Sequence, residues 1–274
     1  MIDKNYHTHM KYCNHAIGDV RDYVLFAKEH GYVELGMSDH APIPPDSMTK
    51  EEWDYNYCGE NMTLDTFEIY LKDIEKCQKE FDGIIVYKAL ESEYLSDFKD
   101  FYKSLRERLD YMIFGVHFFK YNNKIISTYD GVNYDNVLGY LEAAKEGMES
   151  GLFEYLAHPD LFYFEYKDKN GNHTFDDRCE LVTRKIIECA IKNDVYIEIN
   201  ANGLKFSKDV NDNKNYRYPV YQFWNIAREY KDLKVIIGAD AHDPKLLDSE
   251  WIRKVIEFAD ELGIKLQDRL VLNK

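Results

Sequence analysis

Two histidines separated by one residue, His7 and His9, lie near the start of this 274-residue chain. In an extended strand, side chains two positions apart point to the same face, so two imidazoles with this spacing can share one metal ion. Asp240 and His242 form a second pair with the same spacing near the other end of the chain. Such pairs also occur by chance, so each indicates a metal site only if further ligands converge on it.

The histidines of this chain are concentrated at positions where ligands would be needed. Of the nine histidines, all except His30 and His173 fall at or just after the end of an expected strand. These residues are His7, His9, His15, His40, His117, His158 and His242. Imidazoles mixed with carboxylates such as Glu91 and Asp240 suit zinc, manganese or iron better than calcium or magnesium. Because one tetrahedral ion needs about four ligands, the surplus predicts two or three divalent transition-metal ions. Closely spaced metal pairs serve phosphoryl transfer by clamping the attacking and the leaving oxygen.

Short apolar segments alternate along the chain with longer segments of helical periodicity. Strands are expected at residues 6–9, 34–38, 84–91, 111–117, 155–158, 196–200 and 234–240. Helices are expected at residues 19–30, 63–81, 98–108, 133–150, 176–193, 219–230 and 249–262. Asp19 suits a helix N-cap, and Pro219 suits a first helical turn. A series of strand–helix units predicts parallel strands with crossover helices, an α/β fold.

Polar residues at the strand ends distinguish between two parallel architectures. In an open doubly wound sheet, only the strand ends at the switch point meet. In a barrel, all carboxyl ends converge on one mouth. Nearly every expected strand here ends in His, Asp, Glu or Asn, which favours a barrel. Because no linker or repeat divides the chain, we expect residues 1–274 to form a single domain.

The composition argues against several kinds of partner. With 35 Lys and Arg against 50 Asp and Glu, the net charge is −15. This charge disfavours a nucleic-acid surface and docking on anionic lipid. No apolar stretch predicts a membrane span or a signal peptide. The five cysteines form no Cys-x-x-Cys pair, which fits a reduced, cytoplasmic protein. We therefore expect neither nucleic acid nor membrane as a partner, and the oligomeric state is left open.

The ligand-type residues fall in motifs that resemble the PHP (polymerase and histidinol phosphatase) superfamily. The motifs are HTHMKYCNHA at residues 7–16, SDHAP at 38–42, ALE at 89–91, GVH at 115–117, AHP at 157–159 and GADAH at 238–242. The resemblance implies a distorted (β/α)7 barrel with up to three divalent ions at its mouth. It is strongest to the monofunctional histidinol-phosphate phosphatases. It thus implies a metal-dependent phosphomonoesterase that hydrolyses L-histidinol phosphate to L-histidinol and phosphate in histidine biosynthesis.

The resemblance also implies which residues hold the ions. The ligands of one ion would be His7, His9, Glu91 and Asp240. Glu91 would bridge to a second ion, whose other ligands would be His117 and His158. The ligands of a third ion would be His15, His40 and His242. Glu93 is the rival of Glu91 for the bridging position, because both carboxylates lie on one strand face. The family pattern selects Glu91, and Glu93 would then face the ammonium or imidazole of the substrate.

Substrate contacts are expected in the loop after the sixth strand. Lys205 stands where the histidinol phosphatases have an arginine that reaches the phosphate. Lysine keeps the positive charge but lacks the bidentate fork of arginine. The alternative is that Lys205 is only a solvated loop charge. Asn202, in the same loop, is a candidate pocket residue that could equally cap and pack.

Catalytic roles fall to acidic and imidazole groups at the mouth. Asp240 is implied as a metal ligand in the reaction centre. The leaving alkoxide needs a proton or a metal ion, and the nearest candidate donors are Asp39 and His242. For Asp39 we favour another role, in which its carboxylate fixes the tautomer of His40.

Other functions would use the same residues. A nuclease acting on oligonucleotides or nucleoside bisphosphates, or a phosphotyrosine phosphatase, would need the same ions. A nuclease for long strands also needs a basic groove with stacking aromatic residues, and a chain of net charge −15 has no obvious one. A non-catalytic metal-binding module is disfavoured because every expected ligand position is filled.

Overall fold

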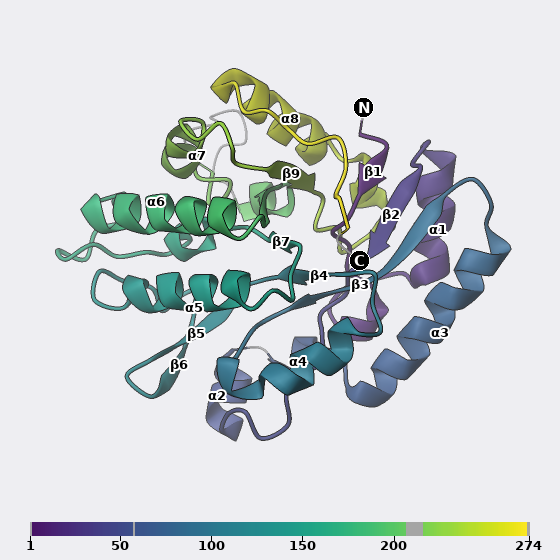
Figure 1. Cartoon of the computed structure of the whole chain (residues 1–274), viewed down its shortest axis with the longest axis horizontal. Helices are drawn as coiled ribbons and strands as arrows, with labels where there is room; N and C mark the ends of the chain where they lie inside the picture. Colours follow the sequence, from purple (N-terminus) through teal and green to yellow (C-terminus); the bar gives the residue numbers. More distant parts are fainter. Residues whose placement is uncertain (1, 57, 207–215, 273–274) are drawn as a thin grey trace.

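The computed structural model describes residues 2–56, 58–206 and 216–272 of the chain. Seven strands form one sheet in the order β1-β2-β3-β4-β7-β8-β9, and each neighbouring pair is parallel. Their bounds are β1 Lys4–Asn5, β2 Glu34–Met37, β3 Ile85–Ser92, β4 Tyr111–Phe114, β7 Tyr155–Leu156, β8 Tyr196–Asn200 and β9 Val235–Gly238. Figure 1 shows these strands at the centre of the molecule with the long helices around them.

The sheet curls until the segments that follow its two edge strands meet. Thr8, after β1, and Ala241, after β9, form a parallel bridge. The backbone N–H of His9 donates to the carbonyl of Ala241 at 2.8 Å. The side chain of Asn5 accepts a hydrogen bond from the N–H of Ala239, also at 2.8 Å. Because this seam is short, the sheet is a nearly closed, distorted seven-stranded barrel, and the predicted architecture is confirmed.

The helices confirm the periodicity of the sequence to within a few residues. Their bounds are α1 Val20–Glu29, α2 Lys50–Tyr55, α3 Leu64–Glu80, α4 Lys99–Arg106, α5 Val137–Glu149, α6 Asp177–Lys192, α7 Tyr221–Ala227 and α8 Glu250–Leu262. Asp19 caps α1 as predicted, because its side chain accepts from the N–H groups of Arg21 and Asp22. Across the described part of the chain, no helix combines the length and apolar character needed to cross a membrane.

Several boundaries differ from the prediction by a few residues, and two of these differences affect the segments around the site. The first strand ends at Asn5 rather than His9, because residues 7–9 pair only through the bridge at Thr8. Pro219 precedes α7 instead of opening it. The next residue, Val220, donates its N–H to the Asp160 carboxylate at 2.6 Å. The chain before α7 is therefore fixed by the loop that follows β7.

A two-stranded hairpin and the short helix α2 were not predicted. The hairpin strands are β5 Phe118–Tyr121 and β6 Lys124–Ser127, paired antiparallel. Asn122 and Asn123 connect them, both with positive φ, which is the conformation of a tight hairpin turn that asparagine tolerates. The Asn-Asn pair between two apolar runs was the available signal for this element.

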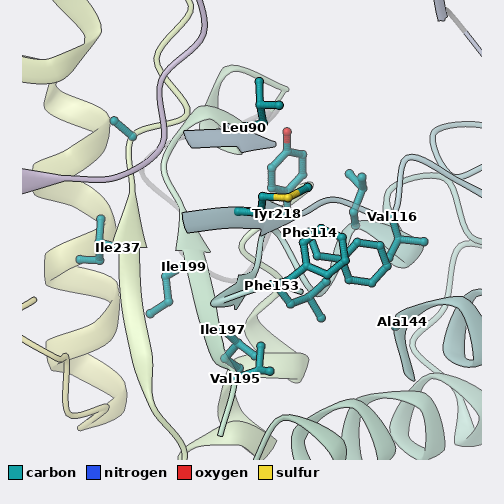
Figure 2. Close-up of a cluster of buried hydrophobic side chains, with 14 of the residues drawn as sticks. Leu90, Phe114, Val116, Ala144, Phe153, Val195, Ile197, Ile199, Tyr218 and Ile237 are labelled. Atoms are coloured by element: carbon teal, nitrogen blue, oxygen red, sulfur yellow. The ribbon is translucent and has the colours of Figure 1, made fainter. Parts of the chain in front are cut away.

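The barrel wall has an apolar outer face, which packs against the helices. Along β8, Ile197 and Ile199 belong to the large core cluster between strands and helices. Figure 2 shows them with Val195 and the neighbouring Ile237 of β9. Because side chains alternate along a strand, Glu198 and Asn200 point to the inside of the barrel. This alternation supplies polar groups to the interior from a strand that is buried on both faces.

Tyrosines fill the barrel near the amino ends of the strands. Tyr6, Tyr111, Tyr155 and Tyr196 form a small apolar cluster there, together with Leu270 of the C-terminal segment. The hydroxyls of Tyr111 and Tyr155 both donate to the carbonyl of Tyr6, at 2.5 and 3.1 Å. In Figure 1 the yellow segment that follows α8 runs towards the centre of the ring of strands. The barrel is thus packed with side chains below its mouth.

Candidate metal centre

The carboxyl ends of the strands surround a cavity of about 430 Å3. The predicted site residues in its lining are His15, His40, Glu91, Glu93, His117, His158, Asn202, Lys205, Asp240 and His242. His7 and His9 lie behind these residues and are fully buried. Residues from both ends of the chain therefore converge on one site, as the barrel predicts.

The residues assigned to the first ion converge closely. The Nε2 atoms of His7 and His9 lie 3.0 Å apart. Asp240 Oδ1 lies 3.0 Å from His9 Nε2 and 3.7 Å from His7 Nε2. Glu91 Oε2 lies 3.4 Å from each of these nitrogens. Asp240 Oδ1 is also buried without a hydrogen-bond partner among the described residues. An unpartnered carboxylate oxygen aimed at two imidazole nitrogens is the donor set of a transition-metal ion.

The other oxygen of Glu91 faces the second proposed ion position. Glu91 Oε1 lies 2.9 Å from His158 Nε2 and 3.5 Å from His117 Nε2. The two imidazole nitrogens are 3.3 Å apart. Glu91 thus presents one oxygen to each histidine pair, which is the geometry of a bridging carboxylate. Glu93 has no such position between the two pairs.

The third set is more exposed than the other two. The Nε2 atoms of His15 and His242 lie 2.9 Å apart. His40, His242 and His9 each offer a nitrogen, and these nitrogens lie within 4.8 Å of one another. His40 Nδ1 also lies 3.3 Å from Glu91 Oε2. The structure therefore brings the third set together at the cavity surface, beside the first.

The far nitrogens of several imidazoles have their own acceptors. His7 Nδ1 contacts Glu198 Oε1 at 2.7 Å, and His117 Nδ1 contacts Glu93 Oε1 at 2.9 Å. His242 Nδ1 lies 3.0 Å from the carbonyl of Asp240. An acceptor at Nδ1 places the proton there and leaves the Nε2 lone pair free, which is the usual arrangement behind metal-binding histidines. The residues present therefore fit a multinuclear metal site.

The charges of the centre favour a cation. Burial alone raises the pKa of Glu91, but the surrounding imidazoles, chiefly His7, hold that pKa well below its usual value. Burial likewise raises the pKa of Asp240, but the surrounding imidazoles, again chiefly His7, hold it well below its usual value. Burial lowers the pKa of His9, yet the nearby carboxylates of Asp240 and Asp39 outweigh this effect and raise the pKa to about 9. The cluster thus stabilises positive charge, as a divalent-cation site must.

Two site residues have an unusual backbone conformation. His158 has φ 31° and Asp240 has φ 48°. Residues other than glycine rarely adopt this left-handed region, which costs on the order of 1–3 kcal/mol and tends to occur at functional sites. Both residues come directly after a strand, where the unusual φ changes the direction of the side chain. The surrounding barrel maintains this strain at two of the predicted ligands.

Asp39 does not lie where a proton donor to the substrate would lie. Its side chain is fully buried, and Asp39 does not line the cavity. One carboxylate oxygen lies 3.6 Å from His9 Nδ1 and accepts the backbone N–H of His40 at 2.9 Å. Its contact with His40 is therefore to the backbone, and the imidazole beside its carboxylate is that of His9. Asp39 is placed to orient His9.

The predicted substrate-binding residues have mixed positions. Glu93 and Asn202 line the cavity, but each also supports a ligand. Asn202 Nδ2 donates to Asp240 Oδ2 at 3.1 Å. Lys205, in the short 3-10 helix Asn202–Phe206, is exposed at the cavity, with its Nζ 4.7 Å from the ring centroid of Phe206. Among the described residues of the lining, Lys205 supplies the lysine ammonium group.

Sequence reasoning missed Glu198 as a site residue. It is fully buried inside the barrel, between His7 and the backbone of His158. Asn200, two positions further along β8, donates to both Glu198 and Asp240. The available signal was a carboxylate within the apolar strand Tyr196–Asn200, where a buried charge needs a partner.

A nearly closed α/β barrel with clustered histidines and carboxylates at its mouth defines the class of the protein as a multinuclear metal-binding barrel. The family model described as "PHP domain" matches residues 5–202. The chain belongs to this family.

Curated relatives match over nearly their whole length. The "Probable histidinol-phosphatase" of Deinococcus radiodurans is 24% identical over 265 residues, covering 94% of this chain and 93% of the relative. The "Histidinol-phosphatase" of Bacillus subtilis is 23% identical over 268 residues, covering 88% of this chain and 94% of the relative.

Solved structures share the fold at low sequence identity. The hisK structure from Listeria monocytogenes has a TM-score of 0.71 and 19% identity, covering 90% of this chain and 98% of that one. Histidinol phosphate phosphatase from Lactococcus lactis has a TM-score of 0.70 and 19% identity, covering 99% of both chains. That structure is a complex with zinc, L-histidinol and phosphate. At this identity the structural likeness supports the barrel fold.

Proposed function

We propose that this chain is a metal-dependent phosphomonoesterase that hydrolyses L-histidinol phosphate to L-histidinol and phosphate in histidine biosynthesis. The observation that carries the proposal is the position of Glu91. Its two oxygens face two separate histidine pairs, at distances from 2.9 to 3.5 Å. The match to two relatives named histidinol-phosphatase, over nearly their whole length, supports this choice of substrate. A small-molecule substrate fits the cavity, and a biosynthetic role fits a cytoplasmic enzyme.

The same proposal covers the extent of the catalytic unit. Seven strands, the first beginning at Lys4 and the last ending at Gly238, belong to one sheet. The segment after α8 pairs with β9 at Leu266 and adds Leu270 to the cluster inside the barrel. These contacts support a single PHP-type phosphoesterase domain over residues 1–274.

The ligand sets would hold two or three zinc, manganese or iron ions. Such ions lower the pKa of a bound water towards neutrality and stabilise the negative charge of the phosphoryl oxygens. Glu91 and Asp240 supply anionic oxygens, because their pKa values lie well below the usual range. The phosphate group of the substrate would face these ions, with Lys205 as a further positive charge at the cavity.

His242 is the candidate donor of a proton to the leaving alcohol. It lines the cavity, whereas Asp39 lies behind His9. Burial, and then the charge of His9, lower the pKa of His242 well below its usual value. This shift disfavours the protonated form that a proton donor needs and favours the neutral imidazole, which can ligate an ion. In the three-ion form His242 would therefore serve as a ligand, and the leaving oxygen would be stabilised by the metal instead.

A phosphate-release screen tests the proposed function. The purified protein, reconstituted with zinc or manganese, is assayed on histidinol phosphate, phosphotyrosine and nucleoside 3′,5′-bisphosphates, and kcat/KM is compared. We expect the largest kcat/KM for histidinol phosphate. A larger value for phosphotyrosine or for a bisphosphate would replace the substrate assignment but keep the metal-dependent phosphoesterase. No phosphate release from any of them would overturn the proposed function.

A further inference from the structure

Glu198 links two of the proposed ion positions without facing the cavity. Its side chain is fully buried, and Glu198 is not part of the cavity lining. Oε1 contacts Nδ1 of His7 at 2.7 Å. Oε2 accepts the backbone N–H of His158 at 3.2 Å and the side-chain amide of Asn200 at 2.8 Å. Each carboxylate oxygen therefore supports a different ligand residue.

The contact with His7 determines which ring nitrogen carries the proton. A carboxylate accepts but cannot donate, so His7 must place its proton on Nδ1. Its Nε2 lone pair then points to His9, Asp240 and Glu91, where the first ion is proposed. A histidine with the proton on Nε2 could not ligate an ion at that place.

The contact with His158 supports a strained backbone. His158 has φ 31°, and its N–H is held by Glu198. Its Nε2 faces Glu91 Oε1 and His117 Nε2, where the second ion is proposed. An acceptor on this N–H helps to keep the turn that directs the His158 ring into the site.

We infer that Glu198 is a positioning residue for two ions at once, an inference that rests on the metal site of the proposed function. It acts on one ion by fixing the tautomer of His7 and on the other by holding the backbone of His158. Gly238 provides independent evidence for this close placement. A Cβ at position 238 would overlap Oε1 of Glu198. Gly238 lies in β9 and is not among the glycines with positive φ, so its backbone conformation does not require glycine. The missing side chain instead leaves room for the Glu198 carboxylate.

The first test is Glu198→Gln, with zinc binding measured by competition with chelators of graded strength. The amide offers only one acceptor oxygen, so it must present its NH2 group either to His7 or to the two donors on the other side. The ion position behind the ligand that faces NH2 should lose about 10- to 100-fold in zinc affinity, the usual effect of losing a partner behind a metal ligand. The other of the two positions should weaken with it, because both share Glu91. The third position, formed by His15, His40 and His242, should keep the wild-type affinity.

The matched control is Glu154→Gln. Glu154 is another largely buried carboxylate of the barrel, which accepts from Met112 N–H at 2.8 Å and from Arg106 at 2.6 Å. This control should bind zinc like the wild type even if its melting temperature falls. Zinc affinity unchanged in Glu198→Gln, or equal weakening of all three positions, would overturn the inference. A wild-type protein that binds no zinc would instead overturn the metal site itself.

A second variant keeps the inference testable if Glu198→Gln does not fold. Gly238→Ala keeps the carboxylate group of Glu198, but the added methyl group pushes it away from His7. We expect the same selective loss of two zinc positions. In the double variant Glu198→Ala/Gly238→Ala the overlap disappears, so its zinc affinity should equal that of Glu198→Ala alone. Additive losses would mean that Gly238 acts by another route and would contradict the inference.

Discussion

Glu93 Oε1 lies 2.9 Å from His117 Nδ1, on the side of the ring opposite to the proposed ion. Glu93 also lines the cavity. One carboxylate thus faces the substrate space and fixes a metal-binding imidazole. The sequence-based interpretation, in which Glu93 faces the substrate, does not include its contact with His117.

The contact predicts a mixed effect for Glu93→Gln. Because the amide keeps an acceptor oxygen but loses its charge, His117 should be held less firmly and a cationic substrate less well. We expect kcat to fall and KM for histidinol phosphate to rise, with a zinc affinity about 10-fold weaker at one position. Steady-state kinetics combined with zinc competition measures all three. A change in KM alone would restore the simpler role of Glu93.

Glu91→Gln should have a much larger effect. Its oxygens face both histidine pairs, so the variant loses the shared anionic ligand of two ions. We expect kcat to fall by several orders of magnitude and the bound metal, measured by elemental analysis, to drop by at least one ion per chain. Glu75→Gln, which alters an exposed carboxylate paired with Lys88 of β3, is the control. If Glu93→Gln lost more metal than Glu91→Gln, the bridging assignment would be wrong.

Metal removal should lower stability as well as activity. In the metal-free protein, Asp240 Oδ1 is buried without a hydrogen-bond partner among the described residues. The carboxylates of Glu91 and Asp240 also lie close to the same nitrogen of His7, with no cation between them to offset their negative charges. An ion present at 100 times its Kd adds about 2.7 kcal/mol to the free energy of unfolding. Thermal unfolding before and after dialysis against a strong chelator measures the change. Zinc or manganese should restore the melting temperature, and calcium should not, because the donors are largely imidazoles.

Most of the elements that position the site could be predicted because each has a local signal. The capping box at Asp19 and the helical periodicity of residues 64–80 are properties of neighbouring residues. Histidines at strand ends indicated a barrel because only a barrel brings all those ends together. The hairpin after His117 was missed because its turn residues lie inside a segment interpreted as a crossover.

The groups that support the ligands were harder to predict for a physical reason. Glu198, Asp39 and Glu93 each contact a histidine that follows another strand, between 24 and 191 residues away along the chain. No spacing rule connects such residues, since the contacts depend on the register of the barrel. His7 could be recognised as a ligand type, but its partner Glu198 could be recognised only as a carboxylate inside an apolar strand.

Lys205 should contribute to both binding and chemistry if it meets the phosphate. The charge-assisted hydrogen bond it would make is worth roughly 1.5–3 kcal/mol, equivalent to roughly 10- to 150-fold in kcat/KM. We expect Lys205→Ala to lose this amount and Lys205→Arg to keep most activity, because the guanidinium matches phosphate geometry. Lys72→Ala, on the outer helix α3, serves as the control. A loss of less than about threefold in Lys205→Ala would make Lys205 a solvated loop charge.

The opposite end of the barrel should govern stability rather than chemistry. Glu34, at the start of β2, is 4% exposed. It accepts the hydroxyl of Tyr6 at 2.6 Å and the guanidinium of Arg269 at 2.5 Å. Glu34→Ala leaves a buried hydroxyl without its acceptor, so the free energy of unfolding should fall by about 1–3 kcal/mol. Urea unfolding of the metal-free protein measures this loss of stability. Arg269→Ala, at a half-exposed side chain, should have a smaller effect.

Zinc affinity and kcat/KM should stay at wild-type values in both variants, because the amino ends of barrel strands lie away from the mouth. A loss of zinc affinity in Glu34→Ala would mean that the tyrosine layer transmits changes to His7.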